Sequence, residues 1–224
     1  MPYISSAETD GKSSDREIID EALRPLVQKV AKEITNNFSL RKIYEHVFVK
    51  TACDLRYVLQ NPPVISPDLE YNLAKAIYRV GARNCYEGAY LGGFNYAFTR
   101  FIQLVPKVKV ERGDWAQEFR YWLYAGTISA LVYASRHTEK LNIGIDGVFI
   151  DIKDEYKWRV NRAYETAQIL RSGDCYNTPW YNKPLELTDE NGAVVGHIYV
   201  DVKRSKETLN LDLLDYQLVL KKKS

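Results

Sequence analysis

The sequence predicts a mainly α-helical protein: a four- to five-helix bundle with an extended N-terminal helical arm and a small C-terminal antiparallel β appendage. Apolar residues recur every three or four positions through most of residues 16–171, which is the spacing of a buried helix face. The segment "NPPVISP" (61–67) interrupts this pattern most clearly. After "RSGD" (171–174) the apolar period falls to two, which is typical of strands. The expected domains are a polar arm with kinked N-terminal helices (1–60), a helical bundle (61–172), and a β hairpin with a C-terminal tail (173–224).

The first expected helix follows a polar N-terminal segment. Residues 1–14 are too polar to bury a core of their own. Ser14 and Glu17 have the spacing of a capping box, which predicts a helix from about residue 16 to residue 37. Pro25 should kink or split this helix, because proline has no backbone N–H and crowds the preceding turn.

The other helices are predicted from their apolar faces. They are expected over residues 39–60, 68–104, 114–141 and 154–171. A break is expected in the third helix near its glycines. Two connecting segments are expected to lie outside helices: "PKVKVERGD" (106–114) as a loop or short strand, and "IGIDGVFIDI" (143–152) as part turn and part extended chain.

The C-terminal part has the pattern of a β hairpin. Residues 184–204 alternate, with Asn191-Gly192 at the expected turn, and residues 211–220 are expected to add a third strand. Three strands are too few to form a core of their own. The appendage is therefore expected to dock on the bundle or on a neighbouring molecule.

Composition limits the kinds of partner. The net charge of the 224-residue chain is only +2, so any basic surface must be local, unlike that of a strongly basic DNA-binding domain. The three cysteines are widely spaced and form no CxxC, which argues against a disulfide framework or a zinc site and favours an intracellular origin. Methionine is nearly absent while lysine, isoleucine and tyrosine are common, a composition that would suit a thermophile.

Four glycines lie in the third helical segment, where each costs about 1 kcal/mol relative to alanine. Gly81, Gly88 and Gly92 are spaced to lie near one face, with Gly93 beside them. One interpretation is a tight helix crossing inside the bundle. The other is a smooth face that a subunit or a nucleic-acid backbone approaches, with nearby tyrosines and arginines as phosphate donors: Tyr78, Arg79, Arg83 and Tyr86.

The same segment carries a family resemblance. "LAKAIYRVGAR" (73–83) followed by "YLGGFNYAF" (90–98) resembles a segment in the helical major capsid proteins of archaeal filamentous viruses, of the rudivirus and lipothrixvirus type. The matching pattern is Ala74, Lys75, Ala76, Ile77, Arg79, Val80, Gly81 and Ala82, and the similarity covers residues 70–104. The order of elements also agrees, whereas the C-terminal β segment departs from the shortest members of that family.

The resemblance implies a four-helix-bundle coat protein. Such proteins form dimers, often of two related chains, and their N-terminal helical arms wrap linear double-stranded DNA that is held in A-form. Some virions of this type carry a lipid envelope. The expected function is therefore that of a non-enzymatic structural virion protein, assembled in the host cytoplasm and needing no cofactor.

A DNA-wrapping arm requires cations that replace condensed counterions, and no base-reading residues. The first 83 residues supply the predicted phosphate contacts: Lys12, Arg16, Arg24, Lys29, Lys32, Arg41, Lys42, Lys50, Arg56, Lys75, Arg79 and Arg83. Each of these could also belong to an ordinary solvated helix face, because acids accompany them along the chain.

Three alternatives remain open at the level of sequence. Asp146 and "Asp151-Ile152-Lys153" after an apolar run are similar to the acidic strand of PD-(D/E)xK nucleases, in which two carboxylates hold Mg²⁺ and a lysine polarises water. Arg41 and His46 have the spacing of the Arg-x4-6-His motif of helical RNases of the HEPN type. A non-enzymatic helical adaptor, with the β appendage as its partner site, would need no chemistry.

Overall fold

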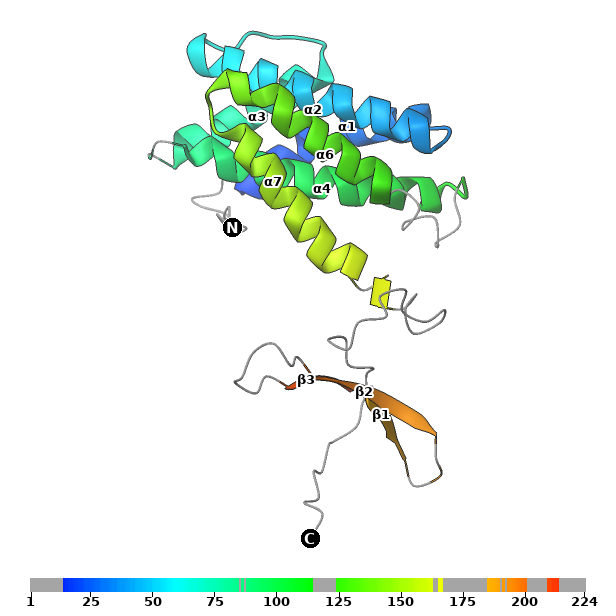
Figure 1. Ribbon diagram of the computed structural model, residues 1–224. Helices are drawn as coiled ribbons and strands as arrows, with labels where there is room; N and C mark the ends of the chain where they lie inside the picture. The colour runs from blue at the N-terminus through cyan, green and yellow to red at the C-terminus, as the bar shows by residue number, and fades with distance from the viewer. Residues whose placement is uncertain are drawn as a thin grey trace. The chain divides into compact units, whose positions relative to one another are not determined.

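The structure is a computed structural model, and its chain divides into two compact units, residues 1–166 and 167–224 (Figure 1). The residues that it describes are 14–84, 86, 88–114, 124–162, 165–166, 185–189, 191, 193–200 and 209–213. The expected polar arm therefore lies outside the described residues, apart from Ser14 at its end.

The first unit is a helical bundle, which confirms the prediction of a mainly helical protein. Its elements are α1 (Asp15–Glu33), α2 (Asn37–Gln60), α3 (Leu69–Arg83), α4 (Ala89–Glu111), α6 (Tyr124–Thr138), the short 3₁₀ turn η1 (Glu139–Leu141), α7 (Ile145–Tyr156) and the π-helical turn η2 (Lys157–Asn161). The break expected near the glycines separates α3 from α4.

Helices α1 and α2 belong to the bundle itself, which corrects the expected extended helical arm. The capping box that starts α1 is present: the Ser14 hydroxyl accepts from the Glu17 N–H at 3.3 Å, and the Glu17 carboxylate accepts from the Ser14 N–H at 2.9 Å. Along α1, Ile19, Leu23 and Leu26 are completely buried, and the helix packs against α3 and α4. An arm free to wrap DNA would have to expose these side chains to water.

Two prolines lie inside helices. Pro25 lies within α1 and does not split it; the residue is exposed, so water can satisfy the carbonyl group that loses its partner. Pro106 lies within α4, so residues 106–111 are helical, and the loop or short strand expected there is wrong. Val105 and Lys109, four residues apart, are both buried and keep this last turn on the core.

The prediction of part turn and part extended chain at 143–152 is also wrong beyond the first residues of the segment. A turn is present, with Asn142 and Gly144 in the left-handed region, but α7 starts immediately after it at Ile145. Its buried residues are three or four apart, which is the helical period: Ile145, Val148, Phe149, Ile152 and Tyr156.

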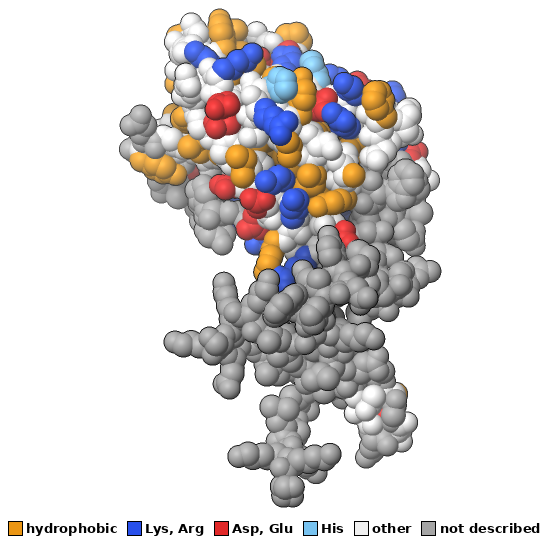
Figure 2. Space-filling model, in the orientation of Figure 1, with side chains coloured by type: hydrophobic (Ala, Val, Ile, Leu, Met, Phe, Trp, Pro, Cys, Tyr) orange, Lys and Arg blue, Asp and Glu red, His pale blue; other side chains and the backbone are white. Residues whose placement is uncertain are grey.

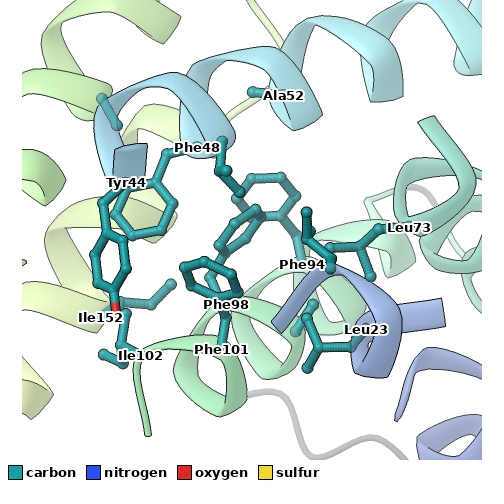
Figure 3. Close-up of a cluster of buried hydrophobic side chains, with 14 of the residues drawn as sticks. Leu23, Tyr44, Phe48, Ala52, Leu73, Phe94, Phe98, Phe101, Ile102 and Ile152 are labelled. Atoms are coloured by element: carbon teal, nitrogen blue, oxygen red, sulfur yellow. The ribbon is translucent and has the colours of Figure 1, made fainter. Parts of the chain in front are cut away.

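Within the hydrophobic core, aromatic rings from three helices form a cluster (Figure 3). Phe48 of α2 lies 5.1 Å from Phe98 of α4 and 5.5 Å from Phe149 of α7, between ring centroids. Phe94 and Phe101 extend the cluster along α4. Because tilted and edge-to-face pairs are favourable beyond simple burial, this cluster joins α2, α4 and α7 into one core.

Tyr44 lies at the edge of this cluster, and its hydroxyl group points toward Ile102 and Ile152 (Figure 3). Among the described residues this hydroxyl has no hydrogen-bond partner. Burial raises the pKa of Tyr44 well above its ordinary value, and Tyr156 raises it further. The phenol is therefore uncharged, as a fully buried side chain must be when no cation accompanies it.

Two of the glycines in this region, Gly81 and Gly93, allow α3 and α4 to approach closely. A Cβ atom at Gly81 would stand 3.0 Å from the Tyr90 backbone nitrogen, and one at Gly93 would stand 3.4 Å from an Ile77 methyl group. Gly88 has φ of 81° and is the N-cap of α4, a conformation that side chains other than glycine rarely adopt. The contacts described are those of a tight crossing inside the bundle.

Helices α2 and α6 lie side by side and run in the same direction. At their first turns, Asn37 Oδ1 and Leu40 Cδ2 stand 2.7 and 3.0 Å from the place where a Cβ on Gly126 would be. At the other end, the Arg56 guanidinium donates to the Lys140 carbonyl oxygen at 3.3 Å. Helix α7 returns along the other side of α6, where Tyr156 stacks on Tyr124 (Figure 1).

The second unit contains a three-stranded antiparallel sheet in the order β1-β2-β3. The strands are β1 (Leu185–Thr188), β2 (Val194–Val200) and β3 (Leu209–Leu213). The β1–β2 turn includes Asn191, and the Asp189 carboxylate accepts from the Asn191 and Ala193 N–H groups. The third strand was expected at 211–220; β3 begins two residues earlier, and residues 214–220 lie outside the described part.

Candidate nucleic-acid interface

Lys29 on α1 is committed to an interaction inside the bundle. Its ammonium group lies 3.6 Å from the carboxylate of Glu70 on α3, and Glu70 is only 3% exposed. A buried carboxylate requires a nearby cation, because water no longer stabilises its charge. Lys29 therefore has a structural role, and its replacement by an acid would perturb the fold before it reported on DNA.

Lys50 joins α2 to the start of α3. Its ammonium group lies 2.8 Å from Asp54 on its own helix and 2.6 Å from Asp68, the N-cap of α3. Partial burial acts to lower the pKa of Lys50, but the hydrogen bonds to Asp54 and Asp68 outweigh it and raise that pKa. Likewise, partial burial acts to raise the pKa of Asp68, but the hydrogen bonds from Lys50 and from the start of α3 lower it to about 2.

Arg41 and Lys42 share one carboxylate at the start of α2. Glu45, which is 5% exposed, accepts from Arg41 Nε at 2.7 Å, and Lys42 Nζ lies 3.8 Å from its other oxygen. Lys42 also lies over the Phe38 ring at 5.9 Å. Two cations on one carboxylate leave an excess positive charge at this position.

Four other predicted cations contact their own chain. Arg56 and Lys75 donate to the backbone oxygens of Lys140 and Val64, at 3.3 and 3.4 Å. Arg83 lies 3.4 Å from Asp15, and Arg16 lies 5.6 Å from the centre of the Tyr96 ring. Exposed contacts of this kind contribute little stability and can be exchanged for phosphate contacts.

Three predicted cations are exposed and make no ion pair or hydrogen bond with any described residue: Arg24, Lys32 and Arg79. Lys12 lies outside the described residues. The predicted set therefore does not converge on one site; it is spread over α1, α2 and α3, and most of its members are engaged inside the molecule.

The predicted phosphate contacts end at Arg83 and so leave out two cations further along the chain. Arg136 and Lys140, at the end of α6 and in η1, are exposed, and their side chains make no ion pair or hydrogen bond with the described residues. The run "SRHTEK" (135–140) was a visible signal in the sequence, but its position beside α2 depends on the fold.

The positions of Asp151 and Lys153 do not fit the nuclease interpretation. Asp151 and Lys153 lie on α7 rather than on a strand, and residues two apart on a helix point about 200° apart. Lys153 instead lies 3.1 Å from Asp154. No group of three His, Cys, Asp or Glu side chains within the described ranges is placed to hold a metal ion.

The helical RNase interpretation is not supported by the contacts of its arginine, because Arg41 is engaged by Glu45. His46 is exposed on the same helix.

Among the helices of the described residues, none is long and apolar enough to span a bilayer.

Comparison of the chain with protein-family models, with curated proteins and with solved structures gives no match. The resemblance carried by residues 70–104 therefore remains a prediction from the sequence.

Proposed function

We propose that this protein is a structural virion protein: a major coat protein that wraps linear double-stranded DNA, in A-form, within a helical filament. Its partners are the duplex and further coat subunits, either copies of itself or a paralogous chain that dimerises with it. It functions in the virion, after assembly in the host cytoplasm.

The observation that carries this proposal is the set of exposed cations whose charge is not used inside the bundle. Five such cations are exposed in the described part of the chain: Arg24 and Lys32 on α1, Arg79 on α3, and Arg136 and Lys140 at the end of α6 and in η1. A coat that binds every sequence alike needs only such contacts to the backbone. A net charge of only +2 suits subunits that must also pack against one another.

Exposed apolar side chains support a role in assembly. Phe38, Val64 and Trp158 are 68%, 59% and 65% exposed, and Ile65 is 97% exposed. The loop that carries Ile65 is held in place: the Tyr71 hydroxyl accepts from the Val64 N–H at 3.1 Å. Large apolar side chains presented by a fixed loop suit a protein contact, because little ordering entropy is lost on binding.

The C-terminal part has a proposed role in the same assembly. Residues 173–224 form the β appendage of the proposed architecture, and its sheet and tail extend onto neighbouring subunits. This role would explain a three-stranded sheet that has too few strands for a core of its own.

The proposal is tested by binding the protein to linear duplex DNA in EDTA and in Mg²⁺, with nuclease protection measured on the same samples and electron microscopy of the products. We expect cooperative binding in EDTA, protection of the duplex and regular filaments. The affinity should fall steeply with salt, because bound phosphates release counterions.

Two results would overturn the proposal. Cutting of DNA that requires Mg²⁺ and is lost in Asp151→Ala would indicate a nuclease. Absence of binding, both by the chain alone and after addition of a second coat chain, would favour a helical adaptor.

A further inference from the structure

The α2–α6 pair has a basic outer surface that the predicted set covered only in part. The pair is fixed at both ends, by the approach of Asn37 and Leu40 to Gly126 and by the hydrogen bond from Arg56 to the Lys140 carbonyl oxygen. The exposed residues of α6 between these points therefore lie beside α2. On the face of the helical unit that Figure 2 shows, blue Lys and Arg side chains and the pale-blue histidines lie among apolar side chains, with red Asp and Glu side chains between them.

Cations outnumber carboxylates along this pair. We call these residues the α2–α6 strip: Arg41, Lys42, Glu45, His46, Arg56, Arg136, His137, Glu139 and Lys140. It contains five Lys and Arg residues and two carboxylates. One of the carboxylates, Glu45, is 5% exposed and already contacts two of the cations. The next acid along α2, Asp54, is held by Lys50.

The outward face of α1 has the opposite balance. Arg24 and Lys32 are exposed there, but so are three glutamates: Glu17, Glu21 and Glu33. Lys29 adds no net charge, because it lies beside the buried Glu70 carboxylate. A polyanion that approached α1 would therefore meet these three glutamates against the charges of Arg24 and Lys32.

Several donors of the strip are held in place before a ligand arrives. The Arg56 guanidinium is anchored to the Lys140 backbone by one of its N–H groups, which leaves its other donors available. The His137 ring stacks on Tyr133 at 3.6 Å between centroids, and its Nδ1 lies 2.7 Å from the Tyr133 carbonyl oxygen. Side chains that are already ordered lose less entropy when they bind a phosphate.

We propose that the α2–α6 strip, and not the outward face of α1, holds the phosphate backbone of duplex DNA. The occupant is argued from charge complementarity and length: from Arg41 to Arg56 the helix rises about 22 Å, which is long enough to meet several phosphates of a duplex. This inference rests on the proposed function and names the surface that performs it.

The test compares two matched double charge reversals in the full chain, Arg136→Glu with Lys140→Glu, and Arg24→Glu with Lys32→Glu. All four residues are exposed, and their side chains make no ion pair or hydrogen bond with the described residues. Affinity for a labelled linear duplex is measured at several salt concentrations. We expect the α6 pair to lower the affinity more than about tenfold and to reduce the salt slope by about 2, while the α1 pair changes the affinity by less than about threefold.

A milder pair, Arg136→Gln with Lys140→Gln, keeps the test valid if the glutamates disturb the end of α6. It should give the same change in salt slope, and circular dichroism should show unchanged helix content. An unaffected salt slope in the α6 pair, or a larger loss of affinity in the α1 pair, would overturn the proposal that the α2–α6 strip holds DNA. In that case, DNA binding by the unchanged protein would still support the proposed function. Absence of binding by the unchanged protein would overturn both.

Discussion

At the scale of single residues, Lys50 illustrates how the fold uses a surface cation. It was predicted to contact phosphate, but it lies between Asp54 and Asp68 and joins α2 to the first turn of α3. Asp68 also accepts from the Glu70 and Tyr71 N–H groups as the N-cap of α3. Replacing Lys50 would therefore affect stability before it affected any nucleic acid.

We expect Lys50→Met to make the bundle less stable at neutral pH and less sensitive to acid. The folded pKa of Asp68, about 2, lies below its unfolded value of about 3.9. Its stabilisation is therefore fully present above about pH 4 and is lost as the pH falls through about 2. Because both groups are partly exposed, water screening limits the loss at pH 7 to about 1 kcal/mol.

Urea denaturation at pH 7 and at low pH measures this difference. Lys32→Met is a suitable control, because Lys32 has no ion-pair partner among the described residues. If both variants lost stability equally with acid, Lys50 would not be the partner that holds the Asp68 charge.

At the scale of elements, apolar spacing predicted most helices. Whether a proline ends a helix, or a short segment is helical, depended instead on tertiary packing. The Ser14–Glu17 capping box and the break after Gly81 followed from local chemistry. Pro106 did not end α4, because the buried residues around it hold the last turn on the core. Segment 143–152 has glycines and β-branched residues, and only its burial pattern in the fold identifies it as helical.

Two glycines provide a matched pair at this scale. We expect Gly81→Ala to destabilise the bundle by about 1–3 kcal/mol, because its Cβ would press on the Tyr90 backbone at 3.0 Å, where nothing can move cheaply. Gly147→Ala should instead stabilise it by up to about 1 kcal/mol, because Gly147 lies within α7 with no atom within 4 Å of the new Cβ.

Thermal and urea unfolding of both variants, followed by circular dichroism, provide the measurement. Opposite signs are expected. A loss of stability in both would mean that the close approach of α3 and α4 is not what distinguishes the two sites.

At the scale of the whole molecule, the first unit has a continuous core from Ile18 to Tyr156. We expect a fragment of residues 1–166 to unfold in one cooperative transition, with a Tm within about 5 °C of the corresponding transition of the full chain. Calorimetry of both proteins tests this expectation. A broad transition, or loss of near-ultraviolet circular dichroism in the fragment, would show that the bundle depends on residues after 166.

The candidate site could be predicted only in part, because ion pairing is a long-range property. The sequence identified which residues are basic, but Lys29 pairs with Glu70 and Arg83 with Asp15, partners that are far apart along the chain. Arg136 and Lys140 were missed because only the fold brings the end of α6 beside α2.

The order of the helices along the chain has a consequence for the rates of folding and unfolding. Helices α3 and α4 are joined by a short turn, whereas residues 61–123 separate the neighbours α2 and α6. Because closing a longer loop costs more entropy, the α3–α4 hairpin should form early and the α2–α6 contact late. Gly81→Ala should then slow folding, whereas Gly126→Ala, which crowds Asn37 and Leu40, should leave the folding rate unchanged and accelerate unfolding. The lifetime of the folded bundle would thus be governed by a contact between two helices that are far apart along the chain.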